Sequence, residues 1–117
     1  MRNPIKSEFY TFTAKTSGSQ GANAWYQLNV GGAREIVFQT ADGGSPASQA
    51  SQEWYITNQT YSEIIDANTG FIADDAQYLP IPNGRTPFVV HSNDEYLNVF
   101  ANPDGRGSTN LHVWVIR

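Results

Sequence analysis

The sequence predicts an all-β protein, an antiparallel β-sandwich or barrel of jelly-roll-like type with about eight short strands. Short stretches that alternate between apolar and polar residues recur along the chain with polar turns between them. The composition includes three Trp, six Tyr, six Phe, ten Gly and six Pro, and no long helix-forming run occurs. With 117 residues, the chain can form one core. We therefore expect a single domain over residues 1–117 with a short flexible N-terminal segment, residues 1–7.

The first third of the chain contains three expected strands: residues 8–14 (EFYTFTA), 25–30 (WYQLNV) and 35–40 (EIVFQT). Residues 15–24 are rich in Gly, Ser and Asn and predict a loop. Gly31 and Gly32 form a short connection between the second and third strands, which predicts a hairpin.

The middle of the chain alternates loops and short strands. An exposed loop is expected over 41–52, a strand over 53–57 (EWYIT), a turn over 58–62, a short strand over 63–66 (EIID) and a turn over 67–70. A short helical turn competes with a strand over 71–79, because residues 73–77 have weak β preference. Pro80 and Pro82 exclude a central strand around Ile81. The next strand lies within 86–91 and starts just after Pro87.

The C-terminal stretch, residues 95–117, predicts two strands joined by a turn. Val99 and Ala101 alternate with Asn98 and Phe100, which is the period of a strand. Residues 102–105 (NPDG) form a strong turn signal. We expect these two strands to form a central antiparallel pair.

The last strand carries apolar residues on both faces. Leu111, Val113 and Val115 supply one face, and Trp114 and Ile116 supply much of the other. A solvated outer strand would be apolar on one face only. The strand is therefore either central between two layers or covered on its second face by another subunit.

Charge and composition argue against several classes of function. Charged residues make up 15% of the chain against a typical value of about 25%, which suits extracellular, particle-bound or assembled proteins. The net charge is −4 and the seven Lys and Arg are scattered, whereas nucleic-acid binding needs clustered positive charge. No apolar stretch is long enough to span a membrane, and residues 1–6 (MRNPIK) are not followed by the apolar core of a signal peptide. We expect synthesis in the cytoplasm, and neither nucleic acid nor membrane as a partner.

The sequence offers little for metal or catalytic chemistry. No Cys is present, and His91 and His112 are too few for a transition-metal site. Asp66, Asp74 and Asp75 lie close enough in sequence to hold calcium, with a solvated acidic turn as the alternative. No nucleophile elbow occurs, and the chain is expected not to be an enzyme and to need no cofactor.

Adjacent aromatic pairs supply another clue. Trp25 and Tyr26 form one pair, and Trp54 and Tyr55 form another. Neighbouring residues of a strand point to opposite faces, so one ring of each pair points outward. Outward rings stack on sugars, pack on a partner, or lie beneath loops. A carbohydrate-binding module or lectin that uses Trp25, Trp54 or Tyr55 is the alternative function.

Three stretches, residues 24–40, 51–58 and 96–117, resemble the small accessory virion proteins of tailed bacteriophages, including capsid cement and decoration proteins. The shared features are a short Cys-free chain, a neutral polar surface, a mid-chain WYI strand and an end such as LHVWVIR. The resemblance implies a virion location, a homo-oligomer with a trimer favoured, and contact with the major capsid protein or another virion protein.

The leading expectation is therefore a non-enzymatic structural protein that stabilises or decorates a viral particle through strand-face and loop contacts. A few buried anchors dominate such interfaces. The expected anchors are His112, Trp114 and Ile116, with Phe100 beside them if it shares their face.

Overall fold

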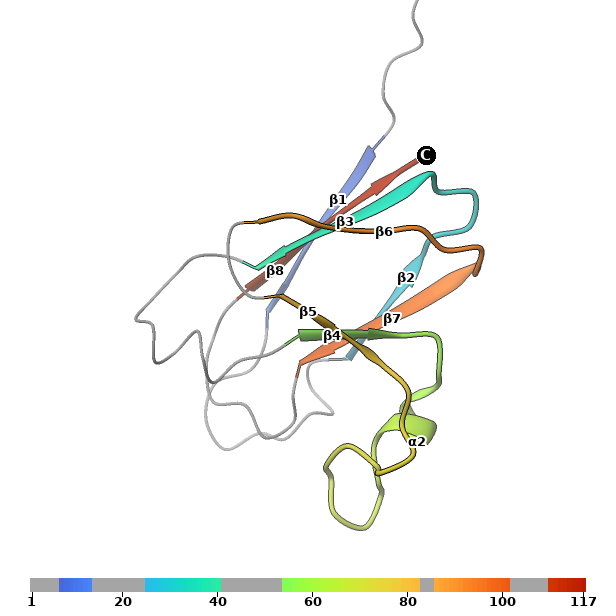
Figure 1. The fold of residues 1–117 in the computed structure, drawn as a ribbon, viewed down its shortest axis with the longest axis vertical. Coiled ribbons are helices and arrows are strands. Elements are labelled where there is room, and N and C mark those ends of the chain that lie inside the picture. Colours follow the sequence, from blue (N-terminus) through green and yellow to red (C-terminus); the bar gives the residue numbers. More distant parts are fainter. Residues whose placement is uncertain (1–6, 14–24, 41–53, 83–85, 102–109) are drawn as a thin grey trace, which may run out of the picture.

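Two four-stranded antiparallel sheets form the protein in the computed structural model, which describes residues 7–13, 25–40, 54–82, 86–101 and 110–117. Sheet A has the order β1 (Ser7–Thr13), β8 (Asn110–Ile116), β3 (Glu35–Thr40), β6 (Phe88–Val90). Sheet B has the order β2 (Trp25–Asn29), β7 (Tyr96–Ala101), β4 (Trp54–Thr57), β5 (Leu79–Ile81). The predicted all-β sandwich of about eight strands is confirmed, and in Figure 1 the two sheets lie one above the other with α2 (Tyr61–Ile64) below them.

The main core lies between the two sheets. Leu111, Val113 and Val115 of β8 are fully buried, as the alternation in the sequence predicts. Residues of sheet B meet them from the other side, among them Leu28, Trp54, Ile56, Leu97 and Val99. Each strand thus contributes every second side chain to one shared apolar layer, which is how aligned sandwiches are stabilised.

The predicted pairing of the two C-terminal strands is wrong. β7 lies between β2 and β4 in sheet B, whereas β8 lies between β1 and β3 in sheet A. Each strand is central in its own sheet, as expected, but the two belong to opposite layers. The eight residues between them are enough to cross the roughly 10 Å that separates packed sheets.

The predicted hairpin between the second and third strands is also wrong, because this connection crosses between the sheets. Val30 N and Gly31 N both donate to Glu95 O, at 2.8 and 3.1 Å, next to sheet B. Arg34 N then donates to Ile116 O at 2.7 Å, in sheet A. Gly32, with φ of 75°, supplies the left-handed backbone that this tight crossing needs.

The middle of the chain folds as an excursion from sheet B, residues 58–78, which we call the α2 excursion. Its helix α2 stands where a turn and a short strand are expected, and Ile65 then pairs with Ile72 in an isolated bridge. Thr60 N donates to Glu63 Oε1 at 3.0 Å, which satisfies an exposed donor at the start of the helix. The stretch 71–79, where a helical turn competes with a strand, contains the bridge residue Ile72, a turn at residues 74–75 and the first residue of β5, and no helix.

The two proline-bounded strands agree with expectation. β5 contains Pro80 and lies at the edge of sheet B, and β6 begins directly after Pro87 at the edge of sheet A. Proline lacks the N–H that a central strand needs, so edges are where it is tolerated.

Several expectations fall outside the described residues: the N-terminal segment up to residue 6, the loops 15–24 and 41–52, Glu53 and the turn at 102–105. Within the described part of the chain, no helix has the length and apolar character needed to cross a membrane.

Candidate functional site

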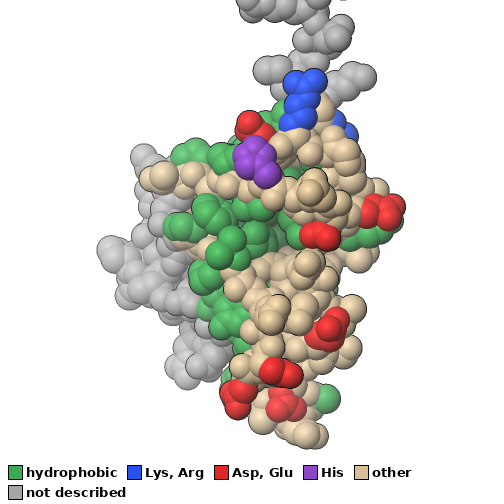
Figure 2. Space-filling model, turned by 45° about the vertical axis from the view of Figure 1, so that its right-hand side comes forward, with side chains coloured by type: hydrophobic (Ala, Val, Ile, Leu, Met, Phe, Trp, Pro, Cys, Tyr) green, Lys and Arg blue, Asp and Glu red, His purple; other side chains and the backbone are tan. Residues whose placement is uncertain are grey.

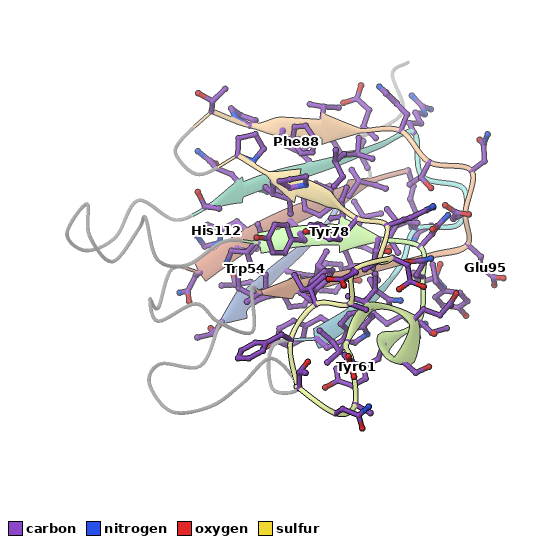
Figure 3. All side chains as sticks on the ribbon, turned by 60° about the horizontal axis from the view of Figure 1, so that its bottom comes forward. Trp54, Tyr61, Tyr78, Phe88, Glu95 and His112 are labelled. Atoms are coloured by element: carbon purple, nitrogen blue, oxygen red, sulfur yellow. The ribbon has the colours of Figure 1, made fainter. Side chains whose placement is uncertain are left out.

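The outer face of sheet B is covered by the protein's own chain. Tyr55 and Phe100 point outward from sheet B and pack with Ile64 and Ile65 of the α2 excursion, and all four side chains are buried. The ring centroids of Tyr55 and Phe100 lie 5.3 Å apart, and Tyr78 packs edge-on against Tyr55 at 4.8 Å. Figure 3 shows Tyr78 lying over β4 and Tyr61 on the excursion. This face is a second, smaller core.

A polar network fixes the excursion to sheet B. Asn98 Nδ2 donates to Gln59 O at 2.8 Å, and Gln59 N donates to Thr57 Oγ1 at 3.0 Å. Thr57 Oγ1 donates to Gln77 O, and Gln77 N donates to Gln59 Oε1, both at 2.8 Å. Buried polar groups with such partners hold a covering segment in one position.

This arrangement corrects one expected anchor, Phe100, and two of the three expected sugar-stacking residues, Trp54 and Tyr55. Phe100 is 1% exposed, lies in sheet B and does not share a face with Trp114. Trp54 is fully buried in the main core and Tyr55 is 6% exposed, so neither presents a free ring face. Trp25 points outward, but it stacks on Phe100 at 5.0 Å and meets Tyr61 edge-on at 5.3 Å. The outward rings lie beneath a covering segment, which was the structural alternative.

The outer face of sheet A is different, because an apolar row crosses all four of its strands. Phe9 of β1 pairs with Trp114 of β8, Trp114 pairs with Val37 of β3, and Val37 pairs with Val89 of β6. Directly paired residues point to the same face, so these four side chains form one continuous stripe. We call Phe9, Trp114, Val37 and Val89 the apolar row.

Aromatic contacts extend the apolar row along β8. The ring of Phe9 lies 5.0 Å from Trp114 and 5.7 Å from His112. His112 Nδ1 lies 3.1 Å from Thr11 Oγ1, and Ile116 follows on the same face of the strand. The predicted anchors His112, Trp114 and Ile116 therefore do share one face.

No segment that the structure describes covers this face. Phe9 is 54% exposed and Val89 is 46% exposed, and Trp114 and Val37 are half-buried. None of the four belongs to either core. Sheet B is thus covered on its outer face by the α2 excursion, whereas sheet A carries a comparable apolar face without such a cover among the described residues.

Arg117 fixes one end of the sandwich, next to this face. Its Nε lies 2.7 Å from Glu8 Oε1, its Nη2 donates to Asn29 O at 2.9 Å, and its Nη1 donates to Gly31 O. Tyr10 donates to the other oxygen of Glu8 at 2.5 Å. The hydrogen bond from Tyr10, followed by that from Arg117, lowers the pKa of Glu8, and the same bond to Glu8 raises the pKa of Tyr10.

A pocket of about 300 Å³ opens between the edge strands β5 and β6. Ile56, Leu79, Val90 and Leu97 supply its apolar lining, and Asn58, Gln77, His91, Ser92 and Asp94 are among its polar residues. His91 Nδ1 lies 2.9 Å from Arg34 O, which can only accept, so Nδ1 carries the proton.

Figure 2 shows hydrophobic side chains gathered along one side of the sandwich, and acidic side chains at the lower end, where the α2 excursion lies.

The structure does not assemble the calcium ligands that the sequence allowed. Asp66 Oδ1 accepts from Asn68 N at 2.8 Å, which closes a local turn. Among the described residues, which include Asp66, Asp74 and Asp75, no three His, Asp or Glu side chains come together to hold a metal ion.

Comparison with known proteins gives no relative: no family model, no curated protein and no solved structure matches the chain.

Sequence reasoning missed three members of the apolar row. Phe9, Val37 and Val89 lie in strands that were expected, but which residues share a face with Trp114 depends on strand order. The alternation in residues 35–40 was an available signal, because Val37 points to the opposite face of the strand from Ile36 and Phe38.

Proposed function

We propose that the protein is a non-enzymatic structural subunit that binds a protein partner through the outer face of sheet A. The supporting observation is the apolar row, which crosses the whole sheet without a cover from any described segment. Exposed apolar stripes of this kind are typical of protein–protein interfaces. Within this face, Trp114, one of the predicted anchors, and Phe9, which the structure adds, would contribute most, because aromatic rings dominate binding energy in such contacts.

We further propose a viral particle as the setting. The support for it is the resemblance of residues 24–40, 51–58 and 96–117 to accessory virion proteins of tailed phages. The low charge content of 15% fits a subunit that spends its lifetime in an assembly. The partner would then be the major capsid protein or another virion protein.

Occupancy on purified particles tests this function. The gene would carry Trp114→Ser, or Tyr96→Ser as the matched control, since Tyr96 is 45% exposed and lies on sheet B. We expect the wild type and the Tyr96 variant to band with particles and the Trp114 variant to stay at the top of the gradient. Equal occupancy of all three proteins, or absence of the wild type from particles, would refute the proposal.

A second candidate, binding of a small carbohydrate, is favoured by the pocket between β5 and β6. Its volume of about 300 Å³ lies at the lower end of the range for ligand sites. An apolar lining with amide, hydroxyl, carboxylate and imidazole groups at its margin suits a sugar, which has apolar C–H faces and many hydroxyls. This site replaces Trp25, Trp54 and Tyr55 as the place where the lectin alternative would act.

Titration with a panel of mono- and disaccharides, followed by NMR, tests the second candidate. Binding would shift the side-chain signal of His91 and would weaken in Asp94→Asn. A panel that leaves the His91 signal unmoved at millimolar concentration would exclude it.

A further inference from the structure

The four edge strands of the sandwich differ in how well they are protected from pairing with another strand. β5 and β6, the edges on one side, have three residues each, and prolines lie within or directly beside them. Short length and proline are the usual means by which a sheet edge is blocked. This side of the molecule is therefore unsuited to strand addition.

β1, at the opposite edge of sheet A, has none of these protections. It is seven residues long, the longest of the four edge strands, and contains no proline. Its register with β8 runs without interruption from Ser7 to Thr13, so no bulge turns it away from a partner. Among the described strands, β8 is its only neighbour.

Charge does not protect this edge either. Glu8 is the only charged residue of β1, and it is held by Arg117 at 2.7 Å and by Tyr10. The other side chains of the strand are Ser, Thr, Phe and Tyr, which have high β propensity or are neutral. A second strand would thus meet no uncompensated charge.

We propose that β1 pairs with β1 of a second copy of this chain, antiparallel and about a two-fold axis, to join two copies of sheet A into one eight-stranded sheet. A strand edge is self-complementary in this arrangement, because the same row of N–H and C=O groups serves both copies. The proposal goes beyond the proposed function, and it holds whether or not the outer face of sheet A binds a virion protein.

Symmetry restricts the register of this pair. A two-fold axis that relates antiparallel strands of one sheet stands perpendicular to the sheet, so the outer face of one copy continues into the outer face of the other. Facing residues must then share a face, so the axis passes between one residue of β1 and the same residue of the second copy. An axis at Tyr10 pairs all seven residues and sets Phe9 opposite Thr11 of the second copy. The Phe9 side chains of the two apolar rows then lie diagonally across the junction, close enough for aromatic rings to touch, and pairing would cover part of Phe9, which is 54% exposed in the single chain.

An interface one strand wide is smaller than a stable dimer interface of about 1,000 Å² or more. We therefore expect association that depends on protein concentration. The resemblance favours a trimer, whereas this edge favours a dimer, so the measured mass separates the two.

Light scattering across a wide concentration range tests the proposal. The wild-type mass should rise from 12.9 kDa to twice that value. Thr11→Lys, which puts a charge on the exposed outer face of β1, should remain monomeric at every concentration. Val89→Lys is the matched control, because Val89 is also exposed on the outer face of an edge strand. It should dimerise as the wild type does, and thermal unfolding should show that both variants fold.

Cysteine trapping tests the register independently, since the chain contains no Cys. Phe9→Cys mixed with Thr11→Cys should give a disulfide-linked heterodimer, whereas Val89→Cys should stay monomeric. The proposal would be overturned by a wild type that is monomeric at every concentration, or by a Thr11→Lys variant that dimerises normally. It would also be overturned by a trimer that the Thr11→Lys substitution does not disrupt. Failure of Trp114→Ser to leave the particle would overturn only the proposed function.

Discussion

Arg117 Nε lies 2.7 Å from Glu8 Oε1, and this ion pair joins the last strand of the chain to the first. The same guanidinium donates to Asn29 O and Gly31 O, which lie at the end of β2 and in the connection that crosses to β3. One side chain of sheet A therefore contacts both the end of β2 and the crossing segment, in addition to the backbone hydrogen bonds of that crossing.

Arg117→Ala should destabilise the protein by about 1–3 kcal/mol, because hydrogen bonds from a charged group to two backbone carbonyls are lost with the ion pair. The partial exposure of the pair, 30% and 44%, keeps the contribution of the ion pair itself small. Arg34→Ala is the control, and as an exposed substitution it should change stability by less than about 0.5 kcal/mol. Chemical denaturation measures both, and equal effects would show that Arg117 does not tie the sheets.

Stability should fall in acid partly through Glu8 and Glu63, whose pKa values are both lowered. The cause for Glu8 is the hydrogen bond from Tyr10 and then Arg117, and for Glu63 it is the hydrogen bond from the Thr60 backbone. A carboxyl whose folded pKa is depressed stabilises the fold above its unfolded pKa and loses that effect as the pH falls through the folded value. The loss should therefore set in near the ordinary value of 4.5 and continue below it.

Glu8→Gln and Tyr10→Phe separate the Glu8 contribution in this pH range. Each should make the dependence of unfolding free energy on pH shallower below about pH 4.5. Glu8→Gln removes the titrating carboxyl, and Tyr10→Phe removes the hydrogen bond that lowers its pKa most. Denaturation midpoints measured from about pH 6 down to about pH 3, a range that spans ordinary carboxyl titration, check this. Slopes identical to that of the wild type would contradict it.

Truncation of two phenylalanines of sheet A should destabilise the protein to very different degrees. Phe38→Ala should destabilise the protein by about 3–5 kcal/mol, because Phe38 is fully buried in the main core. Phe9→Ala should lose much less, because Phe9 is 54% exposed on the outer face. Thermal or urea unfolding distinguishes them, and a large loss for Phe9 would mean that the outer face is covered within the monomer.

Substitution of Phe100 should affect stability, whereas substitution of Trp114 should affect binding to the partner. Phe100→Ala should weaken folding by about 3–5 kcal/mol, because it empties the second core beneath the α2 excursion. Trp114→Ser should leave the monomer folded and remove it from its partner. Hydrogen exchange of the α2 excursion measures the first effect; a Phe100 variant with normal protection there would contradict the assigned packing.

Alternation along the chain predicts which strands exist and much of the core. Leu111, Val113 and Val115 are buried as their spacing indicates, and Pro80 and Pro87 mark edge strands. Strand partners were not predictable in the same way. A short connection such as 30–34 fits a hairpin or a crossing between sheets equally well, and only the tertiary hydrogen bonds of Glu95 and Ile116 decide between them.

Part of the candidate site was predictable and part was not. Trp114 and Ile116 face away from the core, as the two-sided pattern of the last strand suggested. Phe100 could not be assigned, because its place depends on β7 lying in the other sheet. Helix α2 was missed although Thr60 and Glu63 form the T-x-x-E signature of a capping box, a signal that was present in the sequence.

Side-chain footprinting of Trp114 in the assembled state tests the central claim most directly. Hydroxyl-radical labelling, read by mass spectrometry, would compare Trp114 and Phe9 in the isolated protein and on particles. Tyr96 and Phe71, exposed at 45% and 41% outside sheet A, serve as internal references. The account predicts that Trp114 and Phe9 become protected on particles while Tyr96 and Phe71 stay reactive. Unchanged labelling of Trp114 and Phe9, with protection at Tyr96 and Phe71 instead, would contradict it.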